Sequence, residues 1–193
     1  MASRLTSSQT IGPFFHRALL HEGWNDLGAR GANGERIAIE GRVLDGEGAP
    51  VSDAMLELWQ ANAAGRYDHP EDRQEKPLDP NFHGFGRTPT DDEGRFRFST
   101  IKPGPVPGRG DSVQAPHINL TVFARGLLKQ LVTRIYFPDE PLNAGDPLLK
   151  AVPAERRATL IATATGQGTG GAGRVLHFDV ILQGATETVF LDV

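Results

Sequence analysis

The segment His117-Ile118-Asn119 holds the residue types most directly suited to metal chemistry. We predict that it lies on a β-strand, where side chains alternate between faces, so that His117 and Asn119 point the same way. Two histidines in that geometry would place two imidazoles on one metal ion. Here the second position is an asparagine, whose neutral amide is a far poorer ligand for zinc or ferric iron. The segment therefore indicates an incomplete metal site and favours a companion subunit over a self-sufficient metalloenzyme.

The composition argues against several functional classes. The net charge of -4 gives no basic footprint for nucleic acid or an anionic membrane, and no apolar run approaches the ~20 residues of a membrane helix. The first ten residues lack the apolar core of a signal peptide. The chain has no cysteine, which excludes disulfides and thiolate metal sites and fits a cytoplasmic location.

The elements that position His117 are predicted to be strands. The 193 residues include 23 glycines and 14 prolines among short alternating segments, which favours an all-β, single-domain β-sandwich with long loops and one short helix. We expect an N-terminal arm over residues 1–35 and the sandwich domain over residues 36–193. About eight strands are expected, including those at 36–44, 54–60, 96–98, 117–124, 130–137, 174–182 and 186–191. The short helix is expected at 153–162, with Pro153 in its first turn.

Two segments between these strands are predicted to serve the site or a partner. Residues 61–95 are rich in turns, and a loop of this length in a compact domain is usually functional or docked on a partner. The run 102–108 contains three prolines, which remove backbone donors and exclude a central strand or a helix interior. The arm must pack on something, because its large apolar side chains would otherwise be exposed: Phe14, Phe15, Leu19, Leu20 and Trp24.

Two motifs, in this order, resemble the signatures of the intradiol ring-cleavage dioxygenases. The first is LELWQANAAGRY at residues 56–67, and the second is TIKPGP at 100–105 followed by APHI at 115–118. The resemblance runs from about residue 36 to the C-terminus. It implies a β-sandwich and non-haem Fe(III) bound by two tyrosinates and two histidines.

Carried over residue by residue, the resemblance assigns positions to the four iron ligands and to an active-site arginine. The two tyrosine positions fall on Tyr67 and Val106, and the two histidine positions fall on His117 and Asn119. The arginine position falls on Gln114. Two ligands and the cation are therefore missing, so we expect no metal on this chain and only vestigial ligand positions. Ferric iron needs anionic oxygen donors, and the second tyrosine of the chain, Tyr136, lies mid-strand and is expected to be structural.

This loss of ligands within a retained frame resembles the non-iron α chain of the family's two-chain members. The resemblance implies a β chain that carries Fe(III), a small aromatic acid and O2 as substrates, and a higher αβ oligomer. This chain alone would have no catalytic residue. It would instead complete the partner's substrate pocket with Thr10, Gly12 and Pro13 of the arm and with Arg134, which lies in a TRIYF match at 133–137.

Other interpretations of these residues stay open. The chain could be a stand-alone intradiol enzyme acting on catechol or hydroxyquinol, or a non-enzymatic β-sandwich binding module. Taken singly, Tyr67 is more often a loop tyrosine, and His117 more often a satisfied structural histidine. Arg134 on a strand face is most often solvated or ion-paired. The glycine-rich run at 166–173 lacks the strand-to-helix context of a phosphate loop, so we expect no nucleotide site.

Overall fold

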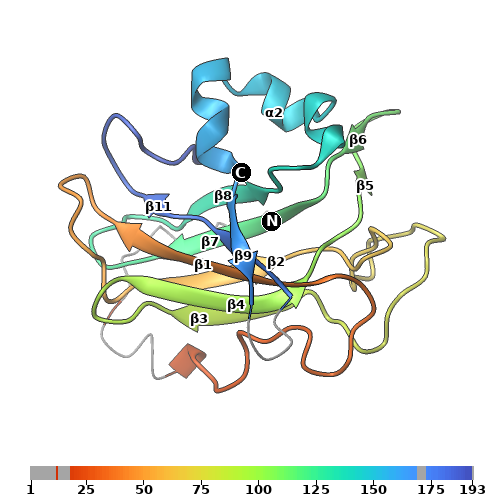
Figure 1. Cartoon of the computed structure of the whole chain (residues 1–193), viewed down its shortest axis with the longest axis horizontal. Helices are drawn as coiled ribbons and strands as arrows, with labels where there is room; N and C mark the ends of the chain where they lie inside the picture. Colours follow the sequence, from red (N-terminus) through yellow and green to blue (C-terminus); the bar gives the residue numbers. More distant parts are fainter. Residues whose placement is uncertain (1–11, 13–17, 169–172, 193) are drawn as a thin grey trace, which may run out of the picture.

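The computed structural model describes residues 12, 18–168 and 173–192, and it is a two-layered β-sandwich (Figure 1). The first layer is a four-stranded antiparallel sheet in the order β3-β2-β7-β8. Its strands are β2 (Met55–Trp59), β3 (Phe85–Pro89), β7 (His117–Phe123) and β8 (Leu131–Tyr136).

The second layer is a five-stranded sheet built around β1. This long strand pairs antiparallel with β4 on one side and parallel with both β10 and β11 on the other. Its strands are β1 (Arg36–Leu44), β4 (Arg95–Ile101), β9 (Thr163–Gln167), β10 (Arg174–His177) and β11 (Val180–Ile181). Outside both layers, β5 (Val106–Pro107) pairs with β6 (Val113–Gln114).

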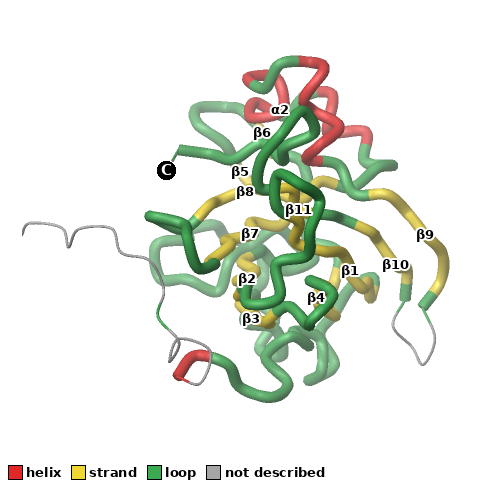
Figure 2. Tube along the Cα trace, turned by 90° about the vertical axis from the view of Figure 1, so that its left-hand side faces the viewer, coloured by secondary structure: helices red, strands yellow, loops and turns green. Residues whose placement is uncertain are grey.

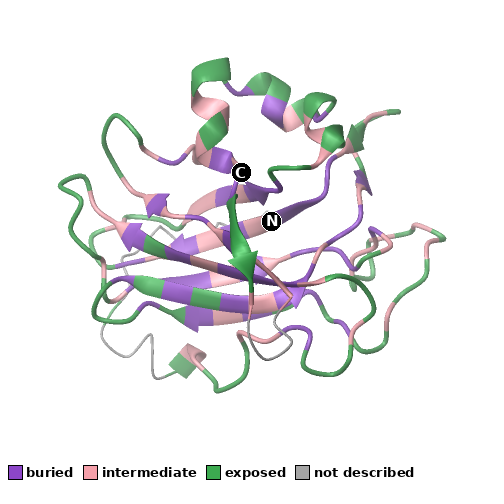
Figure 3. Cartoon of the chain, viewed as in Figure 1, coloured by how far each residue is buried: buried purple, intermediate pink, exposed green. Residues whose placement is uncertain are grey.

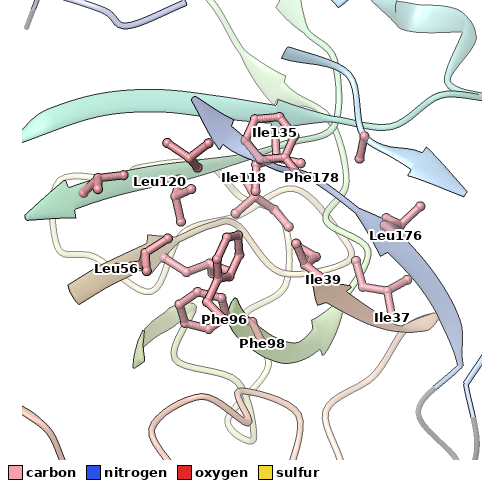
Figure 4. Packing of buried hydrophobic residues seen from close by; sticks show 14 of the residues in the cluster. Ile37, Ile39, Leu56, Phe96, Phe98, Ile118, Leu120, Ile135, Leu176 and Phe178 are labelled. Atoms are coloured by element: carbon pink, nitrogen blue, oxygen red, sulfur yellow. The ribbon is translucent and has the colours of Figure 1, made fainter. Parts of the chain in front are cut away.

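The core lies between the two sheets, as the strand alternation predicts (Figure 4). Fully buried side chains from the first layer, such as Leu56, Ile118 and Leu120, meet Ile39 and Phe98 of the second layer. On the opposite face of β7, Asn119, Thr121 and Phe123 are half buried and His117 is buried, and Figure 3 shows a clear alternation along β4. His117 and Asn119 of β7 and Arg134 of β8 therefore lie on the outer face of the four-stranded sheet.

Three short helical segments connect β8 to β9 and pack at one end of the sandwich (Figure 2): η1 (Pro141–Ala144), α2 (Pro147–Ala151) and η2 (Ala154–Leu160). The helix predicted at 153–162 is a 3-10 helix, and the α-helix precedes it. The reason is local. Asp146 accepts hydrogen bonds from the first free N–H groups and Pro147 favours the first turn, so the α-helix starts there and ends before Pro153.

Two further differences concern strands. The loop expected at 61–95 contains β3, which forms the edge of the four-stranded sheet. The strand expected at 186–191 is absent, which corrects the prediction. Thr188 instead bonds Ile181 through both its backbone N–H (2.9 Å) and its hydroxyl (2.9 Å), and Val189 donates to the Thr159 hydroxyl (3.2 Å). Side-chain hydrogen bonds thus replace a regular ladder in this segment.

The described part of the predicted arm packs on the sandwich. Leu27 is buried in the main core, and its backbone N–H donates to the Ser99 carbonyl at 2.8 Å. Trp24 is 41% exposed and contacts Phe85, with the Arg87 guanidinium over both rings. The division at residue 35 stays a prediction. Within residues 18–168 and 173–192, no helix is both long and apolar enough to cross a membrane.

Candidate functional site

Three side chains form a row across the outer face of the four-stranded sheet. Trp59 on β2 lies opposite Asn119 on β7, which in turn lies opposite Arg134 on β8. Their chain neighbours Leu58, Leu120 and Ile135 are buried in the core, so alternation turns the row outward. Neighbours that are 60 and 15 positions apart in the sequence are therefore brought side by side by strand register alone.

Asn119, at the second histidine position, is fully engaged with its neighbours. Its side-chain amide donates to the Trp59 carbonyl and to the Tyr67 hydroxyl, both at 3.3 Å, and its oxygen accepts from Arg134 Nε at 3.0 Å. Both ends of the amide are thus used within the chain. The residue serves as a hydrogen-bonding bridge between β2, β8 and the loop that carries Tyr67.

Arg134 extends this network toward the small β5–β6 pair. Its NH1 donates to Gln114 Oε1 at 2.7 Å and, more weakly, to the Tyr136 hydroxyl at 3.5 Å. Gln114 in turn donates to the Pro107 carbonyl at 2.9 Å. Because Gln114 pairs with Val106 in the β5–β6 ladder, the guanidinium connects the sheet to the segment that holds the second tyrosine position.

The loop that carries Tyr67 is shaped by its own sequence. The side-chain oxygen of buried Asn62 accepts from the N–H groups of Ala64 and Arg66, both at 3.0 Å, and closes the turn. Gly65 has φ +81°, and a Cβ there would lie 2.0 Å from the Pro105 carbonyl oxygen. Glycine therefore lets this loop pack directly on the proline-rich run and directs Tyr67 over the sheet.

Tyr67 lies against Trp59, with ring centroids 5.5 Å apart and planes inclined by 20°. Burial raises the pKa of the Tyr67 phenol above its usual range, with the nearby Asp72 carboxylate adding to the rise; the Asn119 hydrogen bond and the Arg134 charge oppose it only in part. The phenol is therefore neutral at physiological pH.

His117 keeps the geometry of a metal ligand. Its Nδ1 donates to the Ala115 carbonyl at 2.7 Å, which leaves the lone pair on Nε2. Nε2 is buried and has no hydrogen-bond partner among the described residues. Burial, helped by the Arg134 charge, lowers the pKa of His117 to about 4, so the ring is neutral at pH 7.

Asp146 belongs to the same network, and the sequence analysis missed it. This buried carboxylate accepts from the Ala115 N–H at 2.8 Å and from the Tyr136 hydroxyl at 3.0 Å, and it caps α2. It thus fixes Ala115, whose carbonyl bonds His117, and Tyr136, which pairs with His117 across the sheet. The Asp-Pro pair at 146–147 is a helix-start signal that could have revealed it. Tyr136 is fully buried, as expected of a structural residue.

A pocket of about 570 Å³ opens above this network. Its wall includes three of the residues just described, Tyr67, Val106 and Gln114, together with Trp59 and the loop at 69–74. Val106 is 5% exposed and offers only methyl groups. No cluster of three or more metal-ligating residue types occurs within the described parts of the chain.

The fold and the motifs of this pocket match one class of enzyme. A family model described as Dioxygenase matches residues 12–184. The chain therefore belongs to the intradiol ring-cleavage dioxygenase family. It is similar to the protocatechuate 3,4-dioxygenase alpha chain of Burkholderia cepacia, at 44% identity over 97% of both chains. It is also 46% identical to the beta chain from Burkholderia cepacia, over 80% of this chain and 67% of that one.

Solved structures agree with the fold. The dioxygenase domain of a dioxygenase carbohydrate-binding protein fusion from Streptomyces sp. SirexAA-E is similar, with a TM-score of 0.64 and 28% identity over 83% of this chain and 88% of that one. The expected all-β sandwich is confirmed.

Enzymes of this family generally use iron, but the residues present here do not fit a ferric ion. One ligand position is an aliphatic side chain and one is an amide already engaged within the chain, which leaves a single phenol and a single imidazole. Ferric iron requires anionic oxygen donors.

The structure brings Tyr67, Val106, Asn119 and Arg134 into one network, with His117 beside it. Thr10 and Pro13 lie outside the described residues, and Gly12 is exposed.

Proposed function

We propose that this chain is the non-iron alpha chain of an αβ protocatechuate 3,4-dioxygenase. The assembled enzyme cleaves protocatechuate between its two hydroxyl-bearing carbons and inserts both atoms of O2, giving 3-carboxy-cis,cis-muconate in the catabolism of aromatic compounds. Fe(III) is carried by the beta chain, and several αβ units form a higher oligomer. The similarity to an alpha chain along nearly the whole sequence supports this assignment.

The observation that carries the proposal is the state of the ligand positions. Val106 is buried without a donor atom, and Asn119 is held by three hydrogen bonds inside the chain. A stand-alone enzyme acting on catechol or hydroxyquinol would need its own iron at this place. A binding module without enzymatic function would have no use for the retained frame of Tyr67 and His117. The proposal accounts for both features.

In the proposed complex, this chain shapes the partner's substrate pocket through its arm at residues 1–35, while residues 36–193 form the sandwich domain. Thr10, Gly12 and Pro13 would form a rigid wall beside the aromatic ring, because glycine allows close approach and proline fixes the backbone. Among the described residues, a Cβ on Gly12 would meet nothing within 4 Å, which fits close approach by a neighbouring chain.

Arg134 has a less direct place in this proposal. The sequence predicts that it lines the partner's pocket and attracts the anionic substrate, and that role stays a prediction. In the described residues its donors face Asn119 and Gln114 of this chain. We therefore assign the substrate wall to the arm. A cytoplasmic location is proposed from the lack of cysteines.

Co-expression tests the proposed function. This chain and a beta chain would be purified alone and as a pair, and each sample assayed for O2 uptake with protocatechuate. Activity of the pair above that of either chain alone supports the proposal. Full activity of this chain alone would establish the stand-alone alternative, and failure to associate with any beta chain would favour a binding module.

A further inference from the structure

Arg134 occupies the vestigial site as a half-buried cation bonded to neutral groups. Its Nε and NH1 donate to the amide oxygens of Asn119 and Gln114 and to the Tyr136 hydroxyl. It forms no ion pair with a carboxylate anywhere in residues 18–168 or 173–192. The cation is instead held by three neutral acceptors, which distinguishes it from the ion-paired Arg87 and Arg174 of the same chain.

The acceptors around Arg134 coincide with the vestigial metal site. Asn119 stands at one ligand position, and Gln114 stands where the family resemblance places an active-site arginine. Tyr67 contacts Asn119, and the Arg134 charge acts on both Tyr67 and His117. One guanidinium thus influences three of the four ligand positions, and through Gln114 it reaches the strand pair that holds the fourth, Val106.

We infer that Arg134 is the resident cation of this pocket. Its guanidinium takes the place of a metal ion by connecting the ligand-bearing strands, and its fixed positive charge keeps a metal cation out. Arginine suits this role because it stays protonated at any physiological pH and directs several donors in one plane. The loss of metal binding is therefore not only a loss of ligands.

The charge of Arg134 has an effect on metal binding that the loss of ligands alone does not have. If only ligands were missing, replacing Val106 and Asn119 by tyrosine and histidine would be sufficient to recover metal binding. With Arg134 present, the new ligands would still meet a like charge that opposes Fe(III). Removal of the Arg134 charge must therefore accompany the two ligand substitutions.

The test compares two variants of the full chain that differ only at residue 134. One carries Val106→Tyr and Asn119→His, and the other adds Arg134→Gln, which removes the charge but keeps a polar side chain. Both are loaded with ferric iron and examined by metal analysis and by the visible absorption of phenolate-bound Fe(III). We expect iron to bind the triple variant at least about ten-fold more tightly. Equal iron binding in the two variants, whether strong or absent, would overturn the inference.

A second measurement applies if the triple variant does not fold. Arg134→Gln and Asn119→Leu are made singly and together in the otherwise native chain, and unfolding is followed in denaturant. We expect the two changes to be coupled by roughly a factor of ten in the unfolding equilibrium constant. Strictly additive effects would contradict the role of Arg134. The inference rests on the non-iron role proposed above, but fails separately from it: tightly bound iron on the native chain would defeat the proposed function, whereas these variants test Arg134.

Discussion

At the scale of single residues, His117 shows what remains of the metal site. Its ring is held by the Ala115 carbonyl, and its unprotonated nitrogen is buried without a partner in the described part of the chain. An imidazole in this state cannot accept a proton without placing a charge beside Arg134. Acid should therefore act on this residue in a measurable way.

We expect the free energy of unfolding to fall between pH 6.5 and pH 4 because of His117. Burial, with the Arg134 charge second, lowers its folded-state pKa from 6.5 to about 4. In this window the unfolded chain binds a proton that the folded chain does not, so stability rises with pH and is lost on acidification. The full effect is about 3 kcal/mol. Denaturant unfolding at pH 7, 5.5 and 4 measures it.

The control for this pH dependence is His117→Gln, which cannot titrate. Its stability should depend less steeply on pH between 6.5 and 4 than that of the native chain, whatever its absolute value. Parallel curves for the two chains would show that another group causes the dependence.

Arg134→Ala in the assembled enzyme separates two roles of this arginine. We expect kcat/KM for protocatechuate and for uncharged catechol to change by the same factor, because the donors of Arg134 face Asn119 and Gln114 of this chain. A loss of roughly ten- to a hundred-fold confined to protocatechuate would instead support the sequence-based prediction that Arg134 contacts the anionic substrate.

The residue scale also shows what sequence can and cannot predict. The identities of Val106 and Asn119 already indicate that ligands are missing, because donor chemistry depends only on residue type. The partners of Arg134 could not be predicted, since they follow from the register of β7 on β8 and from the placement of β6. Asp146 was missed for the same reason, although its helix-capping signal was present in the sequence.

At the scale of elements, the contact between two loops positions Tyr67. The turn at residues 62–66 packs backbone to backbone on the proline-rich run, and Gly65 lies at the contact. We expect Gly65→Ala to destabilise the chain by about 3 kcal/mol or more, because its Cβ would overlap the Pro105 carbonyl and the residue has positive φ. Thermal and denaturant unfolding measure the change.

Gly48 provides a matched control for Gly65. It has the same φ of +81°, but a Cβ there would meet nothing within 4 Å. Gly48→Ala should therefore cost only about 1–2 kcal/mol from the left-handed backbone. Equal losses at the two positions would show that the contact between the loops does not contribute to stability.

Long alternating strands were predictable at this scale. The strand expected at 36–44 has those bounds, and those expected at 117–124 and 130–137 differ by a residue at one or both ends. Prediction failed where side chains override pattern. Thr188 bonds in place of a ladder at 186–191, and Asp146 starts the α-helix earlier than Pro153 suggests.

At the scale of the whole molecule, the arm is expected to act on a partner. Deleting residues 1–15 removes Thr10, Gly12 and Pro13 and should lower kcat/KM of the assembled enzyme, weaken assembly, or both. Deleting residues 1–7 keeps these residues and serves as the control. Steady-state kinetics and analytical ultracentrifugation measure the two effects. Similar results for the two deletions would remove the pocket-forming role from residues 8–15.

Exposed aromatic side chains on the described surface also favour contact of this chain with a partner. Trp24 and Phe85 are 41% and 39% exposed and lie beside each other. Aromatic side chains with an arginine between them are typical of protein interfaces. We expect the beta chain to cover this face as part of an obligate interface that buries more than ~2,000 Å² in total.

The most direct test of the central claim is the iron content of the separated and assembled chains. Metal analysis of this chain alone, of its beta partner alone and of the complex should place the iron on the partner, with no stoichiometric iron on this chain. The purified chain should also lack the colour that arises from charge transfer between tyrosinate and Fe(III). About one tightly bound iron per copy of this chain, with matching visible absorption, would contradict the account.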